Sequence, residues 1–125
     1  MAGFVTNIEE ASEKNENFRQ VLFTAPHSQL VAMSLPPNED IGMETHPDVD
    51  QFIRIEEGEG KAILNGEESV LESGSAVVIP AGTEHNIVNT SATEALKLYT
   101  IYSPPNHPDG TIHKTKAGAM AAEKG

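Results

Sequence analysis

The chain lacks cysteine altogether, although it has 125 residues. No disulfide can therefore stabilise the fold, and no thiolate can bind a metal or act as a nucleophile. The redox compartment cannot be inferred either. Any metal site must be built from histidine, carboxylate and amide side chains. Histidine is itself scarce, and the five present are His27, His46, His85, His107 and His113.

Basic residues are also few. Eight Lys and Arg stand against 19 Asp and Glu, and the formal net charge is -11. Nucleic acid and anionic membrane surfaces are poor partners for such a chain, because like charges repel. There is no long apolar run, and residues 1–6 lack the basic start and apolar core of a signal peptide. We therefore expect a cytoplasmic protein.

The composition is that of an ordinary globular domain. Apolar residues make up 38% of the chain and charged residues 22%, which argues against both disorder and a membrane-spanning protein. A chain of this length is typical of one domain, and we expect that domain to span residues 1–125.

Short strand-like runs separated by turn residues are what the chain does contain. Asn65-Gly66 is the strongest of the turn signals, because this dipeptide favours a tight hairpin. The expected strands are residues 18–24, 29–35, 51–56, 61–64, 68–71, 75–79, 86–89 and 96–102. This pattern predicts an all-β antiparallel sandwich or barrel. A proline-rich loop is expected at 103–110 and a short Ala-rich helix at 115–124.

Three metal-capable side chains lie close together in the middle of the chain. Glu44 and His46 are two residues apart, so in a strand they would face the same way. Gln51 opens the next expected strand. If it faces the interior, then Ile53 and Ile55 do so too, by the same alternation. The acidic run at 56–59 is interpreted as a solvated strand end.

A fourth candidate, His85, follows the turn at residues 80–84, and its spacing forms part of a longer pattern. The second half of the pattern is Gly74-x5-Pro80-x-Gly82-x2-His85-x3-Asn89. The first half is Asn38-x5-Glu44-x-His46-x4-Gln51-x6-Gly58.

These stretches, at 38–58 and 74–89, resemble the two motifs of the cupin superfamily. The second matches that family's motif at every fixed position. The first keeps the spacing of Gly-x5-His-x-His-x4-Glu-x6-Gly but changes three residue types. Asn38 replaces Gly, a mild change because Asn tolerates a left-handed backbone. Glu44 stands where the first His is usual, and Gln51 where the Glu is usual.

The resemblance implies a small single-domain cupin, a jelly-roll β-barrel with a divalent metal inside. The matching ligand positions are Glu44, His46, Gln51 and His85. Two imidazoles, one carboxylate and one amide oxygen form a coherent donor set for zinc, and iron, manganese or nickel also suit it. Zinc is favoured, because phosphomannose isomerases of this superfamily use the same set of one Gln, one Glu and two His, with the positions of Glu and Gln exchanged.

A metal-free alternative remains open, in which these four side chains form a hydrogen-bonded cluster lining a pocket. The metal is favoured, because burying four polar groups without a cation needs an elaborate set of partners.

Two function hypotheses follow from the resemblance. The first is a metal-dependent enzyme, of the isomerase or dioxygenase type, acting on a small oxygen-rich or chelating metabolite. The second is a non-catalytic module that binds a metal or a metabolite. Either would suit a homodimer, which small cupins commonly form by sheet packing.

The remaining motif residues and histidines have simpler interpretations. His27 is expected in a solvated loop, and Asn89 is expected to form hydrogen bonds at a strand end. His107 and His113 belong to a turn-rich segment, so both could lie at the surface. Alternatively, this segment covers the barrel mouth and brings one of them to the site as an acid or base, since histidine titrates near neutrality.

Overall fold

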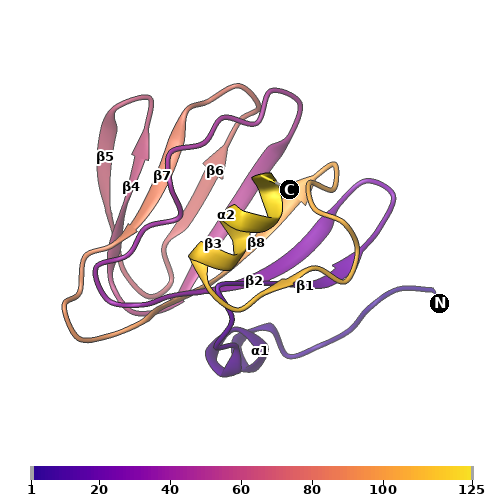
Figure 1. The fold of residues 1–125 in the computed structure, drawn as a ribbon, viewed down its shortest axis with the longest axis horizontal. Coiled ribbons are helices and arrows are strands. Elements are labelled where there is room, and N and C mark those ends of the chain that lie inside the picture. The colour runs from indigo at the N-terminus through magenta and orange to yellow at the C-terminus, as the bar shows by residue number, and fades with distance from the viewer. Residues whose placement is uncertain (1, 125) are drawn as a thin grey trace.

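The structure, a computed structural model, describes residues 2–124, with side chains through residue 122. It consists mostly of two antiparallel β-sheets that face each other (Figure 1). The larger sheet has the strand order β6-β3-β8-β2-β1-β9 and the smaller β5-β4-β7. The elements are α1 (Ile8–Lys14), β1 (Arg19–Thr24), β2 (Gln29–Leu35), β3 (Asp50–Glu57), β4 (Gly60–Leu64), β5 (Glu67–Leu71), β6 (Ala76–Ile79), β7 (His85–Asn89), β8 (Leu96–Ser103), β9 (Ile112–His113) and α2 (Lys116–Lys124).

The expected all-β class is confirmed, as a jelly-roll sandwich of two sheets with a short C-terminal helix. Each expected strand is present, with ends shifted by a residue or so. Asn65 and Gly66 both adopt positive φ, 48° and 84°, as a tight hairpin turn between β4 and β5 requires. Asn38 has φ 63°, so the Asn found in place of the motif's Gly does take the left-handed backbone.

Strand alternation fills the space between the sheets. Gln51, Ile53 and Ile55 of β3 are all buried, as the parity argument predicts. The expectation of a solvated strand end at 56–59 is wrong for Glu56, which is 7% exposed. Its carboxylate forms an ion pair with Arg54, two residues earlier on the same face of the strand. The positive charge of Arg54 offsets part of the free energy lost when the carboxylate of Glu56 leaves water.

The segment that carries Glu44 and His46 is less regular than the sequence indicated. Instead of a continuous strand it forms two isolated bridges to β7, Asp40 with Val88 and Glu44 with His85. Gly42 lies between these bridges with φ 108°, a backbone conformation that interrupts a strand ladder. The segment therefore extends the smaller sheet only loosely.

Two elements were not expected from the sequence. The helix α1 begins after Asn7, whose side chain accepts a hydrogen bond from the backbone N–H of Glu10 at 3.0 Å. Asn followed three residues later by Glu is a helix-start signal, and it was present in the sequence. The two-residue strand β9 carries no such signal. It forms through pairing with β1, where His113 lies opposite Arg19.

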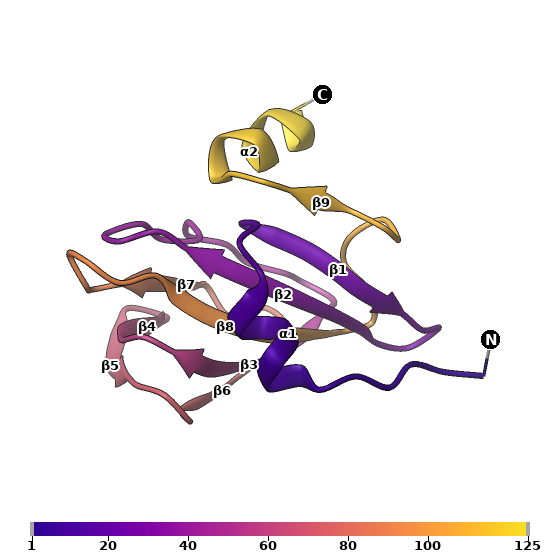
Figure 2. The same ribbon diagram turned by 90° about the horizontal axis from the view of Figure 1, so that it is seen from below.

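The C-terminal segment crosses from the edge of the larger sheet toward the 40–46 segment. After β9, the helix α2 lies beyond that strand and well apart from α1 (Figure 2). Lys116 forms an ion pair with Asp40, and Ala119 is buried in the core. None of the helices in the described residues is long and apolar enough to span a membrane.

Candidate metal centre

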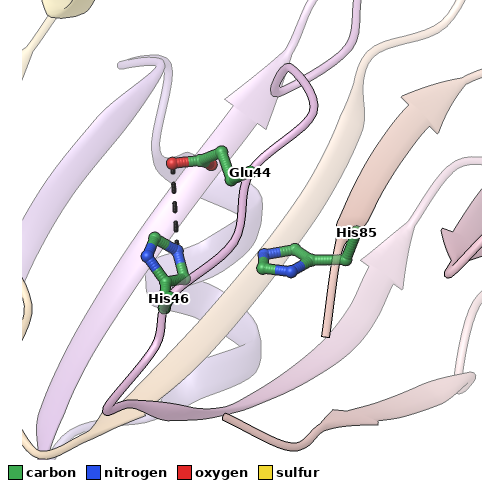
Figure 3. A group of neighbouring side chains, drawn as sticks. All are labelled: Glu44, His46 and His85. Carbon is green, nitrogen blue, oxygen red and sulfur yellow. Dashed lines mark ion pairs between the residues drawn. The ribbon is translucent and has the colours of Figure 1, made fainter. Parts of the chain in front are cut away.

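Glu44, His46 and His85 come together although His85 lies far along the chain. The bridge between Glu44 and His85 brings the two segments side by side, and one ligand atom from each of the three side chains lies within 4.8 Å of the others. Figure 3 shows the carboxylate and the two rings around a common space. Nε2 of His46 is 3.8 Å from Oε2 of Glu44. Two donors on one tetrahedral zinc would be about 3.4 Å apart, so little movement is needed.

The orientation of His85 leaves one ring nitrogen free for a metal. Its Nδ1 is 2.8 Å from the carbonyl oxygen of Thr83. Because a carbonyl can only accept, Nδ1 carries the proton, and Nε2 of the neutral ring keeps its lone pair. A second ring nitrogen held by a backbone carbonyl is the usual arrangement for metal-binding histidines. The turn at Pro80–Gly82 thus delivers a ring that is already in the ligand tautomer.

Gln51 supplies a separate observation. Its side chain is 4% exposed, and its Nε2 donates to Oγ1 of Thr100 at 3.0 Å. Its Oε1 is buried and has no hydrogen-bond partner among the described residues. An unsatisfied buried oxygen costs about 1–3 kcal/mol. A cation beside that oxygen would remove the cost, so Gln51 fits a metal better than it fits a metal-free hydrogen-bonded cluster.

A pocket of about 410 Å³ opens beside Glu44 and His46. Its volume is in the range that small-molecule sites occupy. Glu44 and His46 form one side, and the segment between β8 and α2 forms the other. From that segment the lining residues are Asn106, His107, Pro108, Thr111 and His113. His107 and His113 thus lie at the site and not on an open surface, whereas His27 is exposed as expected.

His107 is held against the site by aromatic packing. Its ring lies edge-on to the buried ring of Tyr102, with centroids 5.2 Å apart, and Tyr102 in turn contacts His46 at 6.0 Å. Burial lowers the pKa of His107 to about 3, with Arg19 and the two nearby histidines adding to the effect. His107 is therefore neutral near pH 7 and can both donate and accept a hydrogen bond.

His113 is also fixed by the protein. NH1 of Arg19 donates to Nδ1 of His113 at 3.3 Å. Guanidinium groups only donate, so Nδ1 of His113 is unprotonated and the ring, when neutral, carries its proton on Nε2. Arg19 itself is almost fully buried at the start of β1.

Sequence reasoning missed the residues that support the site. Tyr102 is buried, and it contacts the rings of His46 and His107, which no sequence pattern indicated. Register explains the placement: Gln29 of β2 and Gln51 of β3 both lie opposite Tyr102 of β8, so the three form one row across the sheet. Strand pairing is not visible in the sequence, and no motif marks Gln29 or Arg19.

Asn89, the last position of the second motif, does form hydrogen bonds at the strand end. Its Nδ2 donates to the carbonyl oxygens of Leu35, Pro36 and Glu94, and its Oδ1 accepts from the N–H of Ser91. The side chain ties β7 to the loop that leads into the 40–46 segment. Its role is structural, as predicted.

Comparison with known proteins decides the family. The family model described as the cupin domain matches residues 31–102, more than half of the chain. The chain is a cupin.

Relatives of this cupin are similar over most of its length. It is 54% identical to the uncharacterized protein YrkC of Bacillus subtilis (strain 168), over 96% of this chain and 67% of that protein. It is 48% identical to the uncharacterized protein L612 of Acanthamoeba polyphaga mimivirus, over 98% of this chain and 79% of that protein. The crystal structure of BH2720 from Bacillus halodurans superposes with a TM-score of 0.92 at 47% identity, covering 94% of this chain and 93% of that one.

Family and geometry together give a cupin fold with a His/Glu group that could hold a divalent metal. The first cupin motif departs from the family pattern at Glu44 and Gln51. The structure nevertheless brings Glu44 to the two histidines and buries Gln51 in the row beside Tyr102.

Proposed function

We propose that this cupin is a metal-dependent enzyme of the isomerase or dioxygenase type, acting on a small, oxygen-rich, chelating molecule. Glu44, His46, His85 and Gln51 would hold a divalent metal, with zinc favoured. The observation that carries the proposal is the donor group of Glu44, His46 and His85, whose ligand atoms lie within 4.8 Å of one another beside a pocket.

The donor set suits the proposed metal in charge and chemistry. One carboxylate and two neutral imidazoles leave a divalent ion with a net charge of about +1, which attracts a carboxylate, enediol or other chelating oxygen group. The amide oxygen of Gln51 is the weakest donor of the four. A weak fourth donor leaves a position that a ligand oxygen can take.

When bound, the metal would supply Lewis-acid polarisation of a ligand oxygen, or oxygen chemistry if it is a redox metal. The chain's own residues hold and orient the side chains of the proposed metal ligands. Thr83 fixes the tautomer of His85 through its carbonyl oxygen, and Tyr102 packs against the ring of His46. The 106–113 segment forms one wall of the pocket and adds hydrogen-bonding groups, among them the neutral ring of His107.

Elemental analysis of the purified protein tests the metal part of the proposal. One equivalent of a divalent transition metal per chain is expected, and removal by a chelator followed by reloading should be reversible. Zinc would direct the search to isomerase-type reactions, and iron to dioxygenase-type reactions. A protein that binds no transition metal even when it is supplied in excess would overturn the proposal.

Turnover separates an enzyme from a binding module. The metal-loaded and metal-stripped forms should be compared on a panel of hydroxy acids, enediols and keto sugars, with mass spectrometry of the products. Product formation by the loaded form alone is expected. Tight binding of panel members without any product would instead support the non-catalytic module.

The homodimer stays a prediction. Val70 and Val78 are exposed on the edge strands β5 and β6, and a dimer interface could cover this apolar surface.

A further inference from the structure

Gln29 has an unusual role for a strand residue. It is 1% exposed, and both ends of its amide bind the loop that follows β8. Its Oε1 accepts from the backbone N–H groups of Asn106 and His107, at 3.1 Å and 3.0 Å. Its Nε2 donates to the carbonyl oxygen of His107 at 2.7 Å and to Oγ1 of Thr24 at 3.0 Å. One buried amide therefore fixes the backbone of the covering loop on both sides of His107.

The hydrogen bonds of Gln29 connect the loop to the candidate metal centre through two aromatic contacts. They fix the backbone at His107, and the ring of that residue packs on Tyr102 with centroids 5.2 Å apart. Tyr102 packs on His46 at 6.0 Å. Because Gln29 and Tyr102 are opposite one another in the β2–β8 pair, the position of the loop is tied to the sheet that carries the site. The loop after β8 is thus held in place by the same sheet that carries Gln29 and Tyr102.

The wall formed by this loop differs chemically from the metal side of the pocket. It offers the amide of Asn106, the imidazoles of His107 and His113 and the hydroxyl of Thr111. The amide and the hydroxyl are uncharged, and burial keeps His107 neutral near pH 7. The only lining carboxylate is Glu44, a proposed ligand, and no lysine or arginine is among the described residues that line this pocket. The guanidinium of Arg19 is buried behind His113, so a bound molecule would meet no lysine, arginine or carboxylate at the surface of this wall.

We propose that the loop clamped by Gln29 is a recognition subsite for the uncharged, hydroxyl-bearing end of a molecule whose other end chelates the metal. The subsite rests on the proposed metal function. It selects polyhydroxy acids over short chelators that reach only the metal. Gln29 acts as a positioning residue, and His107 contacts the ligand. Nothing in the cupin motifs specifies either residue.

Two probes of different length test the subsite by calorimetry on zinc-loaded protein. Oxalate chelates through its carboxylates and is too short to use the far wall. Gluconate has a hydroxy-acid end and a chain of further hydroxyls. Wild-type protein is expected to bind both. The His107→Ala and Gln29→Leu variants should bind gluconate about tenfold more weakly, the loss of one or two net hydrogen bonds. Their zinc content and oxalate affinity should equal those of the wild type.

Controls separate recognition from general damage. His27→Ala removes an exposed histidine outside the pocket and should leave both affinities unchanged. Gln29→Glu keeps the acceptor for the two loop N–H groups but loses the donor to the carbonyl of His107. Its gluconate affinity should fall between those of wild type and Gln29→Leu. If the leucine variant does not fold, Gln29→Glu replaces it in the test.

The outcomes are distinct. Unchanged gluconate binding in His107→Ala would overturn the subsite, and so would equal losses for oxalate and gluconate, which would make the loop a support for the metal ligands. Wild-type protein that binds zinc and oxalate but not gluconate would overturn the subsite alone. Failure of the wild type to take up any metal would overturn the proposed function and the subsite with it.

Discussion

Four histidines lie at or beside one pocket, but their surroundings differ. His46 and His85 lie beside Glu44, and the bond from Nδ1 of His85 to a carbonyl leaves its Nε2 available as a ligand. His107 and His113 lie across the pocket. The ring of His113 accepts from Arg19, and that of His107 packs on Tyr102, with its Nε2 facing the amide of Asn106 at 3.5 Å.

The difference teaches that residue type alone does not assign a role. All four rings could ligate a metal, yet among the residues that the structure describes only the first pair lies in a group of three ligand atoms within 4.8 Å. Low solvation and neighbouring positive charge keep His107 neutral, which makes it a poor proton carrier near pH 7 and a good hydrogen-bonding group. On this contrast we base the proposed division of the pocket into a metal side and a recognition side.

The largest expected effect is the loss of metal when His46 and His85 are removed, set against its retention when His107 and His113 are removed. His46→Ala with His85→Ala should abolish metal binding, because a carboxylate and an amide oxygen are too few strong donors to retain a transition metal. His107→Ala with His113→Ala should keep full metal occupancy. Elemental analysis after dialysis measures both. Metal retained in the first double variant, or lost in the second, would reverse the assignment.

A smaller loss of metal affinity is expected when Gln51, the proposed amide ligand, is replaced. Gln51→Met keeps much of the volume but lacks the oxygen. Relief of the unsatisfied Oε1 is worth about 1–3 kcal/mol to metal binding, so the variant should bind metal roughly 10- to 100-fold more weakly. Competition with a chelator of known affinity gives the value. Equal affinity in Gln51→Met and wild type would exclude Gln51 from the metal side.

The smallest effect concerns pH and the recognition side. Folding lowers the pKa of His107 from 6.5 to about 3, so the unfolded chain binds the proton more strongly than the folded one. The stability linked to this residue is complete above the unfolded pKa and is lost as pH falls from about 6.5 toward 3. The metal-free His107→Gln variant should therefore lose less unfolding free energy between about pH 7 and about pH 5 than wild type.

Urea unfolding at the two pH values measures this difference, with His27→Gln as the matched control, since His27 is exposed. The control should follow the wild type. If His107→Gln shows the same pH dependence as both, the ring of His107 is not buried against the site in solution.

Local patterns predicted most of the framework. Alternation and turn residues placed the eight main strands, and Asn65-Gly66 placed a hairpin, because these features depend on neighbouring residues. The helix α1 was missed although Asn7 and Glu10 carried its start signal. The strand β9 could not be predicted, since its two residues are held in place only by β1.

By itself, the sequence determined the strands, the spacing of the cupin motifs and the donor types at Glu44, His46, Gln51 and His85. Tertiary structure decided which of those donors meet, because the bridge of Glu44 with His85 joins distant segments. It also decided that Gln29, Tyr102 and Gln51 share one row, through strand register. The state of His107 depends on burial by several segments at once. Register and burial are properties of the assembled chain, so no local stretch of sequence encodes them.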